Sequence, residues 1–184
     1  MALFDRFIHP LRRRAARRRL REVALGDVVF VCQGNLCRSP FAEGVFRGLI
    51  AALGVPGVTV QSAGFAPPGR PSPKEAVAAA ALFGVDLSRH RSRLVTPDVV
   101  RRAAVVVVMS PDQGRWIRVR FGRRAARILM LGDLDPLPIE SRTIADPVNQ
   151  SPQVFEACYA RIDRCVHALS RLVTSSPAYA SPSR

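Results

Sequence analysis

Lysine is almost missing from this chain of 184 residues, although 28 of its residues are basic. Lys74 is the single lysine, so the formal net charge of +14 comes almost wholly from arginine. An excess of this kind is typical of proteins that meet nucleic acid, an anionic membrane surface or phosphorylated substrates. Arginine richness that is scattered along a chain can equally reflect the coding bias of a genome. The net charge therefore limits the classes of partner that we expect, but it does not identify one of them.

Long apolar runs are also missing, because none reaches the roughly 18 residues that a membrane-spanning helix needs. Hydrophobic residues nevertheless make up 48% of the chain, which is too many for a disordered protein. A chain of this length can bury a sizeable core in one domain. We therefore expect a single folded domain, with extensions at its ends.

Cysteine is too scarce and too irregularly spaced for a disulfide framework or a zinc site. The four cysteines stand at positions 32, 37, 158 and 165, and the three histidines are scattered. Neither cysteine pair has a common zinc-ligand spacing, and a chain this long needs no disulfides to hold its core. The pattern indicates a reducing, cytoplasmic setting.

Residues 1–26 differ from the rest of the chain in composition. They hold eight arginines against Asp5 and Glu22, a local net charge of +6. Apolar residues there have helical spacing, but Pro10 interrupts them, and the segment lacks the apolar region of a secretory signal. We predict that these residues form a basic, flexible N-terminal extension. The alternative is an anchor for an anionic membrane or an acidic partner.

From residue 27 onward, strand and helix patterns alternate. Short apolar runs predict strands over residues 28–32, 58–62, 104–109 and 126–131. Helical patterns begin near Pro40, Lys74, Pro97, Pro111 and Ser151. This alternation predicts an α/β domain over residues 27–173: one doubly wound, four-stranded parallel sheet with helices on both faces. The polar, proline- and serine-rich residues 174–184 are expected to form a disordered tail.

The last predicted helix has one buried stripe, because its apolar residues are separated by alternating steps of three and four. Two of the cysteines, Cys158 and Cys165, belong to this stripe. We therefore interpret both as core residues without a chemical role.

The loop after the first strand has the composition of an anion-binding site. Cys32 ends the strand, and ligands of parallel sheets bind at the carboxyl ends of the strands. Gly34 and Asn35 tolerate the positive φ angles that turn successive amides inward, and a helix N-terminus follows. A cysteine in such a nest is expected to be a thiolate near neutral pH. Arg38 adds a bidentate donor for a tetrahedral oxyanion, and Ser39 can donate a hydrogen bond to the thiolate.

The string "VCQGNLCRSP" at residues 31–40 resembles the signature of the low-molecular-weight protein tyrosine phosphatase family of bacterial type. The resemblance continues in five further segments and covers about residues 27–173. These segments are "SPFAEGVF" at 39–46, "SAG" at 62–64, "GVDLSRHRSRLVTP" at 84–97, "VVVVMSPDQ" at 105–113 and "ADPVNQS" at 145–151.

This resemblance implies a protein tyrosine phosphatase that hydrolyses phosphotyrosine or related aryl phosphates and needs no metal or organic cofactor. Cys32 would be the nucleophile that forms a cysteinyl-phosphate, and Arg38 would bind the phosphoryl oxygens. Asp146 would be the general acid that protonates the leaving oxygen and then activates water.

The remaining roles that the resemblance implies are supporting ones. Cys37 would form a reversible disulfide with Cys32 on oxidation, although it could also be a small core residue at the helix start. The phosphate-binding loop would comprise Gln33, Gly34, Asn35, Leu36, Cys37 and Ser39. The network that holds this loop would include Ser62 and His90.

The chain departs from the family pattern at the walls of the site. Family members that act on phosphotyrosine usually carry an aromatic residue after the Asp-Pro pair, but Val148 and Asn149 follow Pro147 here. Phe65 is the sole aromatic residue in the loop after "SAG". The branch that acts on phosphoarginine typically has threonine where Leu36 stands, so Leu36 favours an aryl phosphate.

Two alternatives stay open at this point. Arsenate reductases of the same fold use further cysteines in a segment that lacks them here, because no cysteine occurs between Cys37 and Cys158. A weakly active adaptor that binds phosphoproteins would use the same anion nest without turnover. The expected partner is a protein that contains phosphotyrosine, with an anionic membrane or acidic partner at the N-terminal extension. No specific nucleic acid is expected.

Overall fold

A computed structural model describes residues 2–21, 23, 26–122 and 127–174 of the chain. The elements follow one another in the order α1 (Ala2–Arg21), β1 (Asp27–Cys32), α2 (Arg38–Ala52), β2 (Thr59–Gly64), α3 (Lys74–Ala81), α4 (Pro97–Arg102), β3 (Ala103–Val108), α5 (Pro111–Phe121), β4 (Arg127–Met130), the 3-10 helix η1 (Leu131–Leu134) and α6 (Pro152–Thr174). The four strands form one parallel sheet in the order β2-β1-β3-β4. The predicted α/β class and four-stranded parallel sheet are confirmed.

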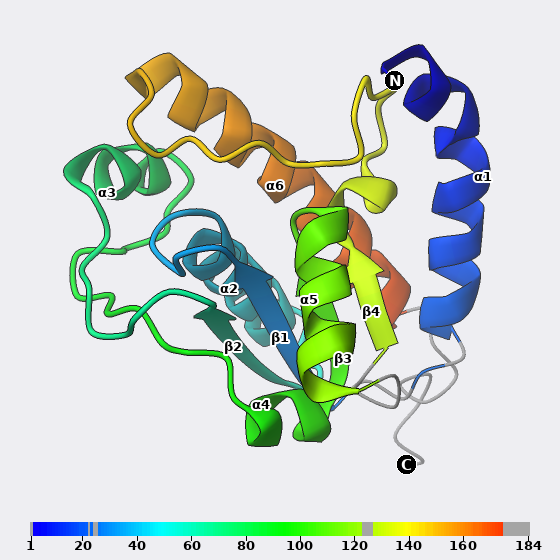
Figure 1. Ribbon diagram of the computed structural model, residues 1–184, viewed down its shortest axis with the longest axis horizontal. Helices are drawn as coiled ribbons and strands as arrows, with labels where there is room; N and C mark the ends of the chain where they lie inside the picture. Colours follow the sequence, from blue (N-terminus) through cyan, green and yellow to red (C-terminus); the bar gives the residue numbers. More distant parts are fainter. Residues whose placement is uncertain (1, 22, 24–25, 123–126, 175–184) are drawn as a thin grey trace.

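Helices cover the sheet on both faces, as Figure 1 shows. Helices α2 and α6 pack against each other on one face, and α3 rests on α6. Helices α4 and α5 contact strands β1, β3 and β4 from the other face. Such burial on both sides explains why the strands are almost continuously apolar in sequence.

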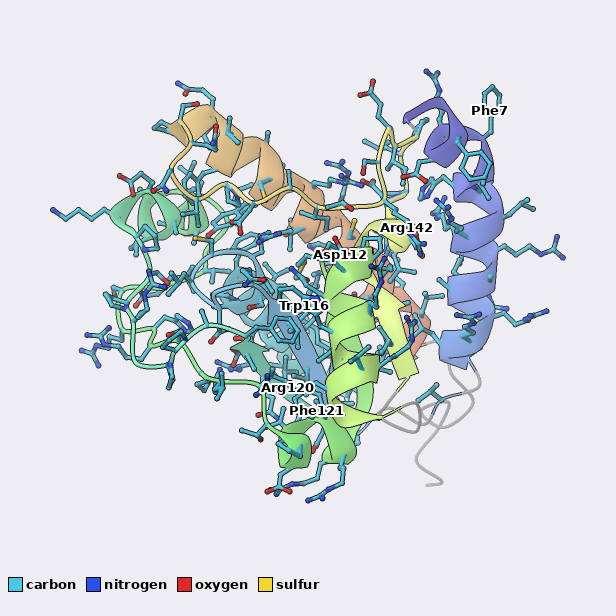
Figure 2. The ribbon with its side chains drawn as sticks, in the orientation of Figure 1. Phe7, Asp112, Trp116, Arg120, Phe121 and Arg142 are labelled. Atoms are coloured by element: carbon cyan, nitrogen blue, oxygen red, sulfur yellow. The ribbon has the colours of Figure 1, made fainter. Side chains whose placement is uncertain are left out.

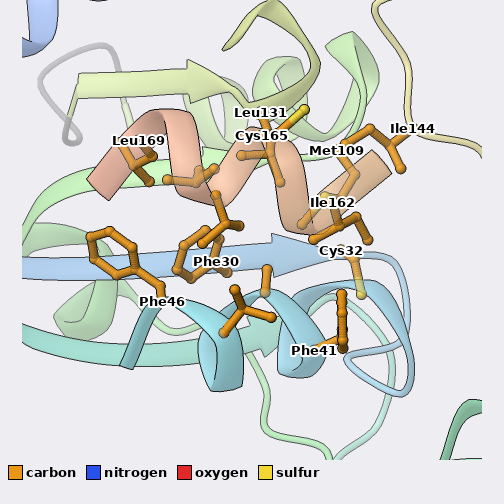
Figure 3. Packing of buried hydrophobic residues seen from close by; sticks show 14 of the residues in the cluster. Phe30, Cys32, Phe41, Phe46, Met109, Leu131, Ile144, Ile162, Cys165 and Leu169 are labelled. Atoms are coloured by element: carbon orange, nitrogen blue, oxygen red, sulfur yellow. The ribbon is translucent and has the colours of Figure 1, made fainter. Parts of the chain in front are cut away.

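Successive residues of β1 point to opposite faces of the sheet and therefore enter two different cores. Val28, Phe30 and Cys32 belong to the larger core, which is shared with α2 and α6. Val29 and Val31 belong to the smaller core beneath α4 and α5. Figure 3 shows Phe30 within the larger core and the Cys32 sulfur at the end of the strand, beside the loop. The core thus fixes the position of the Cys32 thiol.

The last helix buries its predicted stripe with one difference. Phe155, Ile162 and Cys165 are fully buried, whereas Cys158 is partly buried. Tyr159 takes the central place, because its ring stacks on Phe41 of α2 with 4.0 Å between the ring centroids. Burial raises the pKa of the Cys165 thiol to about 12, in agreement with a core residue that has no chemical role.

The N-terminal segment is a correction to the sequence prediction of a flexible extension. Helix α1 runs through Pro10 and lies along α6 and η1. Ala16 and Leu20 are buried in the larger core, and the His9 side chain bonds the backbone oxygen of Asp135 at 2.9 Å. The prediction failed because this buried face of α1 consists of isolated small and apolar residues among arginines, which no simple periodicity reveals.

No helix within the described ranges is long and apolar enough to cross a membrane. The predicted tail over residues 174–184 lies outside the described residues from 175 onward.

Candidate active site

The loop between β1 and α2 is the centre of the candidate site. It begins after Cys32, at the carboxyl end of the sheet, and ends where α2 begins at Arg38. Asn35 holds a φ of 52°, a left-handed conformation that asparagine tolerates better than most residues. Gly64, at the end of the neighbouring strand, passes so close that a Cβ there would lie 2.7 Å from the Asn35 amide nitrogen. The left-handed conformation of Asn35 and the close approach of Gly64 therefore both determine the shape of the loop.

The amides of this loop form a concave set of donors. Backbone N–H groups of Gly34, Asn35 and Leu36 have no acceptor in the part of the chain that the structure describes. Helix α2 begins without a side-chain cap at Cys37. Unsatisfied amides next to a helix N-terminus attract an anion through both their hydrogen atoms and the helix dipole. The described loop therefore has the electrostatics of an oxyanion site.

Asn35 is the hub of a buried hydrogen-bond network beneath the loop. Its side-chain amide donates to the hydroxyl oxygens of Ser39 at 2.9 Å and of Ser62 at 2.8 Å. Its side-chain oxygen accepts from the backbone N–H of Arg93 at 2.7 Å. The His90 Nε2 atom lies 2.7 Å from the Asn35 carbonyl oxygen. The site residues Asn35, Ser39, Ser62 and His90, which the sequence predicts as a group, are thus brought together.

The network gives the Ser39 hydroxyl a defined direction. Because Asn35 donates to the Ser39 oxygen, the hydroxyl hydrogen is free to point to the Cys32 sulfur, 3.0 Å away. The Ala63 carbonyl is a more distant acceptor at 3.4 Å. A hydroxyl donor at this distance stabilises a thiolate more than a thiol. The predicted contact between Ser39 and Cys32 is present.

Glu43 anchors the network at its far end, a role that the sequence reading missed. Its buried carboxylate accepts from the Ser62 hydroxyl at 2.5 Å and from the Arg93 guanidinium at 2.7 Å, and it also pairs with Arg47. Two arginines compensate its charge, as a buried carboxylate requires. The available signal was the spacing: Glu43 lies one helical turn after Ser39 on α2, in a string that the family resemblance already included.

Arg38 links the loop to the distant segment that carries Asp146. Its guanidinium is 4% exposed and donates to the Ile144 carbonyl oxygen at 3.0 Å and to the Asp146 carboxylate. The Asp146 side chain is 42% exposed, so it lies at the mouth of the site. Residues 108 positions apart in sequence are thereby placed together, as the resemblance implies.

The loop that carries Asp146 is held by an ion-pair network that sequence reasoning did not find. Asp135, which is completely buried, accepts from Arg161 at 3.0 Å and from Arg164 at 2.8 Å. These arginines hold the pKa of Asp135 below its ordinary value in spite of burial, which acts in the opposite direction. Arg161 also donates to the Thr143 carbonyl oxygen at 3.0 Å. The loop that carries Asp146 is thus fastened to α6.

Helix α1 fastens the same loop from the other side. The Asp5 carboxylate accepts from the backbone N–H of Arg142 at 3.0 Å, and the Arg142 side chain binds Asp133 at 2.5 Å. Figure 2 shows Arg142 between α1 and the body of the protein. Since α1 precedes residue 27, this brace lies outside the segment in which the sequence indicates the family.

Burial disfavours the thiolate form of the second loop cysteine, Cys37, and of its neighbour on α6, Cys158. Burial raises the pKa of the Cys37 thiol far above its ordinary value. Burial also raises the pKa of Cys158 to about 12, and its sulfur lies 3.6 Å from the Ala145 carbonyl oxygen. Cys158 therefore lies next to the loop that carries Asp146, whereas the sequence predicted an ordinary core position for it. The Tyr159 hydroxyl donates to the Cys37 carbonyl oxygen at 3.3 Å and holds the end of the phosphate loop.

Two aromatic residues, Phe65 and Trp116, lie beside the phosphate loop, whereas the sequence indicated Phe65 alone. The Phe65 backbone N–H donates to the Gln33 carbonyl oxygen at 2.9 Å, which ties this residue to the phosphate loop. Trp116 of α5 packs edge-on against the Phe65 ring, with 5.2 Å between the centroids. Figure 2 shows Trp116 projecting from α5, and its side chain remains 46% exposed. Its contribution was missed because it lies 51 positions away from Phe65, in a helix with no pattern of its own.

The remaining predicted loop residues also lie at the site. Leu36 is buried, and its carbonyl oxygen accepts from the Ser72 hydroxyl at 2.7 Å. Gly34 lies against the Leu36 side chain. Val148 packs against the larger core from the side of the Asp146 loop. Every residue that the sequence predicts for the site is therefore part of the loop, its supporting network or its mouth.

A parallel α/β sheet with a cysteine-containing anion nest at its carboxyl end defines a class of phosphate-handling proteins, and the comparisons with known proteins place the chain within it. The model of the family "Low molecular weight phosphotyrosine protein phosphatase" matches residues 27–177, so the chain belongs to that family. A probable low molecular weight protein-tyrosine-phosphatase, EpsP of Ralstonia solanacearum, is 35% identical over 142 residues, which span 77% of this chain and 91% of that protein.

Two further relatives indicate the breadth of the family. A protein-arginine-phosphatase of Bacillus subtilis is 29% identical over 147 residues, which span 79% of this chain and 95% of the relative. Among solved structures, a low molecular weight protein tyrosine phosphatase from T. tengcongensis superimposes with a TM-score of 0.71 at 29% identity, over 79% of this chain and 98% of that one.

Proposed function

We propose that this protein hydrolyses phosphotyrosine in other proteins through a covalent phosphate on Cys32. The observation that carries the proposal is the Cys32 sulfur at the start of a loop whose amides at Gly34, Asn35 and Leu36 have no acceptor among the described residues, with the Ser39 hydroxyl 3.0 Å from the sulfur. A phosphoryl group in this nest would meet the amides, the helix dipole and the Arg38 guanidinium at the same time.

The proposed reaction has two steps. The Cys32 thiolate attacks phosphorus, so that an S–P bond forms while the bond to the aryl oxygen breaks, and Asp146 donates its proton to that oxygen. Water then attacks phosphorus and gives a proton to the Asp146 carboxylate. The S–P bond breaks, inorganic phosphate leaves, and Cys32 returns as a thiolate. Asp146 can reach the leaving oxygen because its side chain lies at the mouth of the site, beside the Arg38 guanidinium that would hold the phosphoryl group.

Two features favour an aryl substrate. The Phe65 and Trp116 rings offer an aromatic wall beside the loop, in place of the aromatic residue that the family usually has after Asp-Pro. Leu36 stands where the resemblance expects threonine in enzymes that act on phosphoarginine. Phosphotyrosine therefore fits the described walls better than an alkyl phosphate or a guanidinium phosphate.

Cys37 is the proposed redox partner of Cys32. Burial raises its pKa, so a peroxide would first oxidise Cys32 to a sulfenic acid, and the Cys37 sulfur would then displace water from it to form a reversible disulfide. All four cysteines have free thiols in the structure, which suits the proposed cytoplasmic setting.

The test of the enzymatic proposal compares four substrates under one set of conditions. Wild type should hydrolyse para-nitrophenyl phosphate and a phosphotyrosine peptide, and it should act poorly on a phosphoarginine peptide. Arsenate reduction coupled to thioredoxin should not exceed background. Asp146→Asn should lose about a hundredfold to ten-thousandfold in kcat on the phosphotyrosine peptide. A wild type that binds the peptide without turnover would support the phosphoprotein adaptor instead.

The outer face of α1 is the proposed contact with an anionic membrane. Phe4, Phe7 and Leu11 are exposed at helical spacing, and Arg14 and Arg18 continue the same face. Figure 2 shows Phe7 pointing away from the protein. Apolar side chains that enter the lipid boundary, together with arginines at the headgroups, are the features by which amphipathic helices bind anionic bilayers.

Vesicle sedimentation tests this contact. Wild type should bind vesicles of phosphatidylglycerol and phosphatidylcholine in a salt-sensitive manner, and Phe7→Ser with Leu11→Ser should weaken the binding. The control is Leu82→Ser with Val119→Ser, which removes apolar side chains of similar exposure just after α3 and on α5. This variant should bind the vesicles as wild type does. Equal binding by both double variants would refute the contact.

A further inference from the structure

A second basic cavity lies away from the phosphate loop, between helices α1 and α6. Its volume is about 480 Å³, within the range of small-molecule sites. Arg13, Arg17 and Arg21 line it from α1, and Asp163, Arg164, His167, Ala168, Arg171 and Leu172 line it from α6. Leu134 and Pro136 form the part nearest the segment that leads to Asp146. The cavity is therefore walled by three separate parts of the chain.

The arginines of α1 form one stripe that faces this cavity. Arg13, Arg17 and Arg21 are spaced by four residues, which places them one above another on the helix. None of the three has an ion pair or hydrogen bond with any of the residues that the structure describes. The Arg13 Nε atom is buried without a partner. Like charges at this spacing destabilise a helix, so the stripe is costly unless an anion neutralises it.

The opposite wall contributes little negative charge to offset this stripe. Asp163 pairs with His167 on the same helix at 3.6 Å. Asp135, which underlies this wall, is already bound by Arg164 and Arg161. Nearby acids are thus engaged elsewhere, and the guanidinium groups of Arg13, Arg17 and Arg21 remain available to a ligand.

We propose that this cavity binds an anion that carries two or more phosphoryl groups. Guanidinium groups bind phosphoryl oxygens in a bidentate manner, and three of them along one wall match a ligand with several such groups better than a single phosphate. The ligand bridges α1 to α6 and contacts the segment at Leu134 and Pro136. This site is separate from the phosphate loop and does not depend on the proposed catalytic reaction.

Tripolyphosphate is a suitable probe, measured by isothermal titration calorimetry on the full chain with the phosphate loop saturated by orthovanadate. Wild type should bind one equivalent, and the affinity should fall as salt rises. The triple variant Arg13→Gln, Arg17→Gln, Arg21→Gln should bind at least about tenfold more weakly. A second arm uses vesicles with a bisphosphorylated lipid headgroup, to determine whether the natural source of these groups is free in solution or in a membrane.

The matched control changes the same helix by the same charge. Arg14→Gln, Arg18→Gln, Arg19→Gln removes three exposed arginines of α1 that do not line the cavity. This variant should keep wild-type affinity for tripolyphosphate, and circular dichroism should show that both variants are folded. Equal loss of affinity in the two folded variants would overturn the proposal, because the effect would then be one of net charge alone. No binding of tripolyphosphate by wild type would overturn it as well.

Discussion

Substitution of Asn35 tests the proposal that a single buried side chain holds the phosphate loop in shape. Its side chain takes part in three hydrogen bonds, to Ser39, Ser62 and the Arg93 amide. At about 1 kcal/mol each, their loss amounts to about 3 kcal/mol. Alanine would add about 1 kcal/mol because it adopts a φ of 52° less readily. Asn35→Ala should therefore lower the free energy of unfolding by about 4 kcal/mol, a large part of the 5–15 kcal/mol that is typical of a domain.

Urea denaturation followed by circular dichroism measures this change, and para-nitrophenyl phosphate turnover measures its effect on the site. Asn35→Gly serves as the comparison, because glycine accepts the positive φ but removes the same side-chain bonds. It should lose about 3 kcal/mol, and kcat should fall in both variants since the Ser39 hydroxyl is no longer directed to Cys32. A loss below about 1 kcal/mol in Asn35→Ala, with unchanged kcat, would refute the view that this network shapes the loop.

Three further predictions concern the surroundings of the site. Burial lowers the pKa of His90 below 6.5, so the unfolded chain binds the proton more tightly and the free energy of unfolding falls as pH falls through 6.5. His90→Gln should flatten this pH dependence in urea denaturation at several pH values, and an unchanged slope would contradict the prediction. Asp5→Ala removes the hydrogen bond to the Arg142 amide, so it should lower the free energy of unfolding by about 1 kcal/mol and should also lower kcat. An unchanged kcat would show that α1 does not position the Asp146 loop. Trp116→Ala should raise KM about twofold to tenfold for aryl phosphates but not for an alkyl phosphate, and an equal effect on both would dismiss the aromatic wall.

The sequence was most informative where local chemistry decides the structure. Apolar runs placed all four strands to within a few residues, because a sheet buried on both faces needs nearly continuous apolar residues. The phosphate loop was predictable for a related reason. Cys32, Asn35 and Arg38 lie within seven positions, and their residue types are demanded by the geometry of the nest itself.

Long-range pairing was the part that local patterns could not supply. Glu43 and Arg93 meet beneath the loop although 50 positions separate them, and Phe65, just after β2, meets Trp116 of α5. Such contacts depend on how the crossovers pack, and no periodicity in the sequence records them. Asp146 was assigned to the site from the family resemblance rather than from its own surroundings, and in the structure its carboxylate accepts from Arg38.

Helix α1 illustrates a different limit. Its arginines dominate its composition and indicate a solvated arm, whereas its stability depends on the minority of residues that face α6 and η1. Ala16 and Leu20 are buried there, and Asp5 and His9 make contacts with a loop more than 120 positions away. Tertiary packing decides the state of a short amphipathic segment more than its composition does.

The most direct test of the central claim is to locate the phosphoryl group during turnover. Enzyme that is mixed rapidly with para-nitrophenyl phosphate, denatured within the first turnovers and digested should yield the peptide with Cys32 carrying one phosphoryl group. The same treatment of Cys32→Ser should give no turnover above background. Steady turnover by wild type with the phosphoryl group absent from Cys32, or hydrolysis by Cys32→Ser at the wild-type rate, would contradict the proposed mechanism.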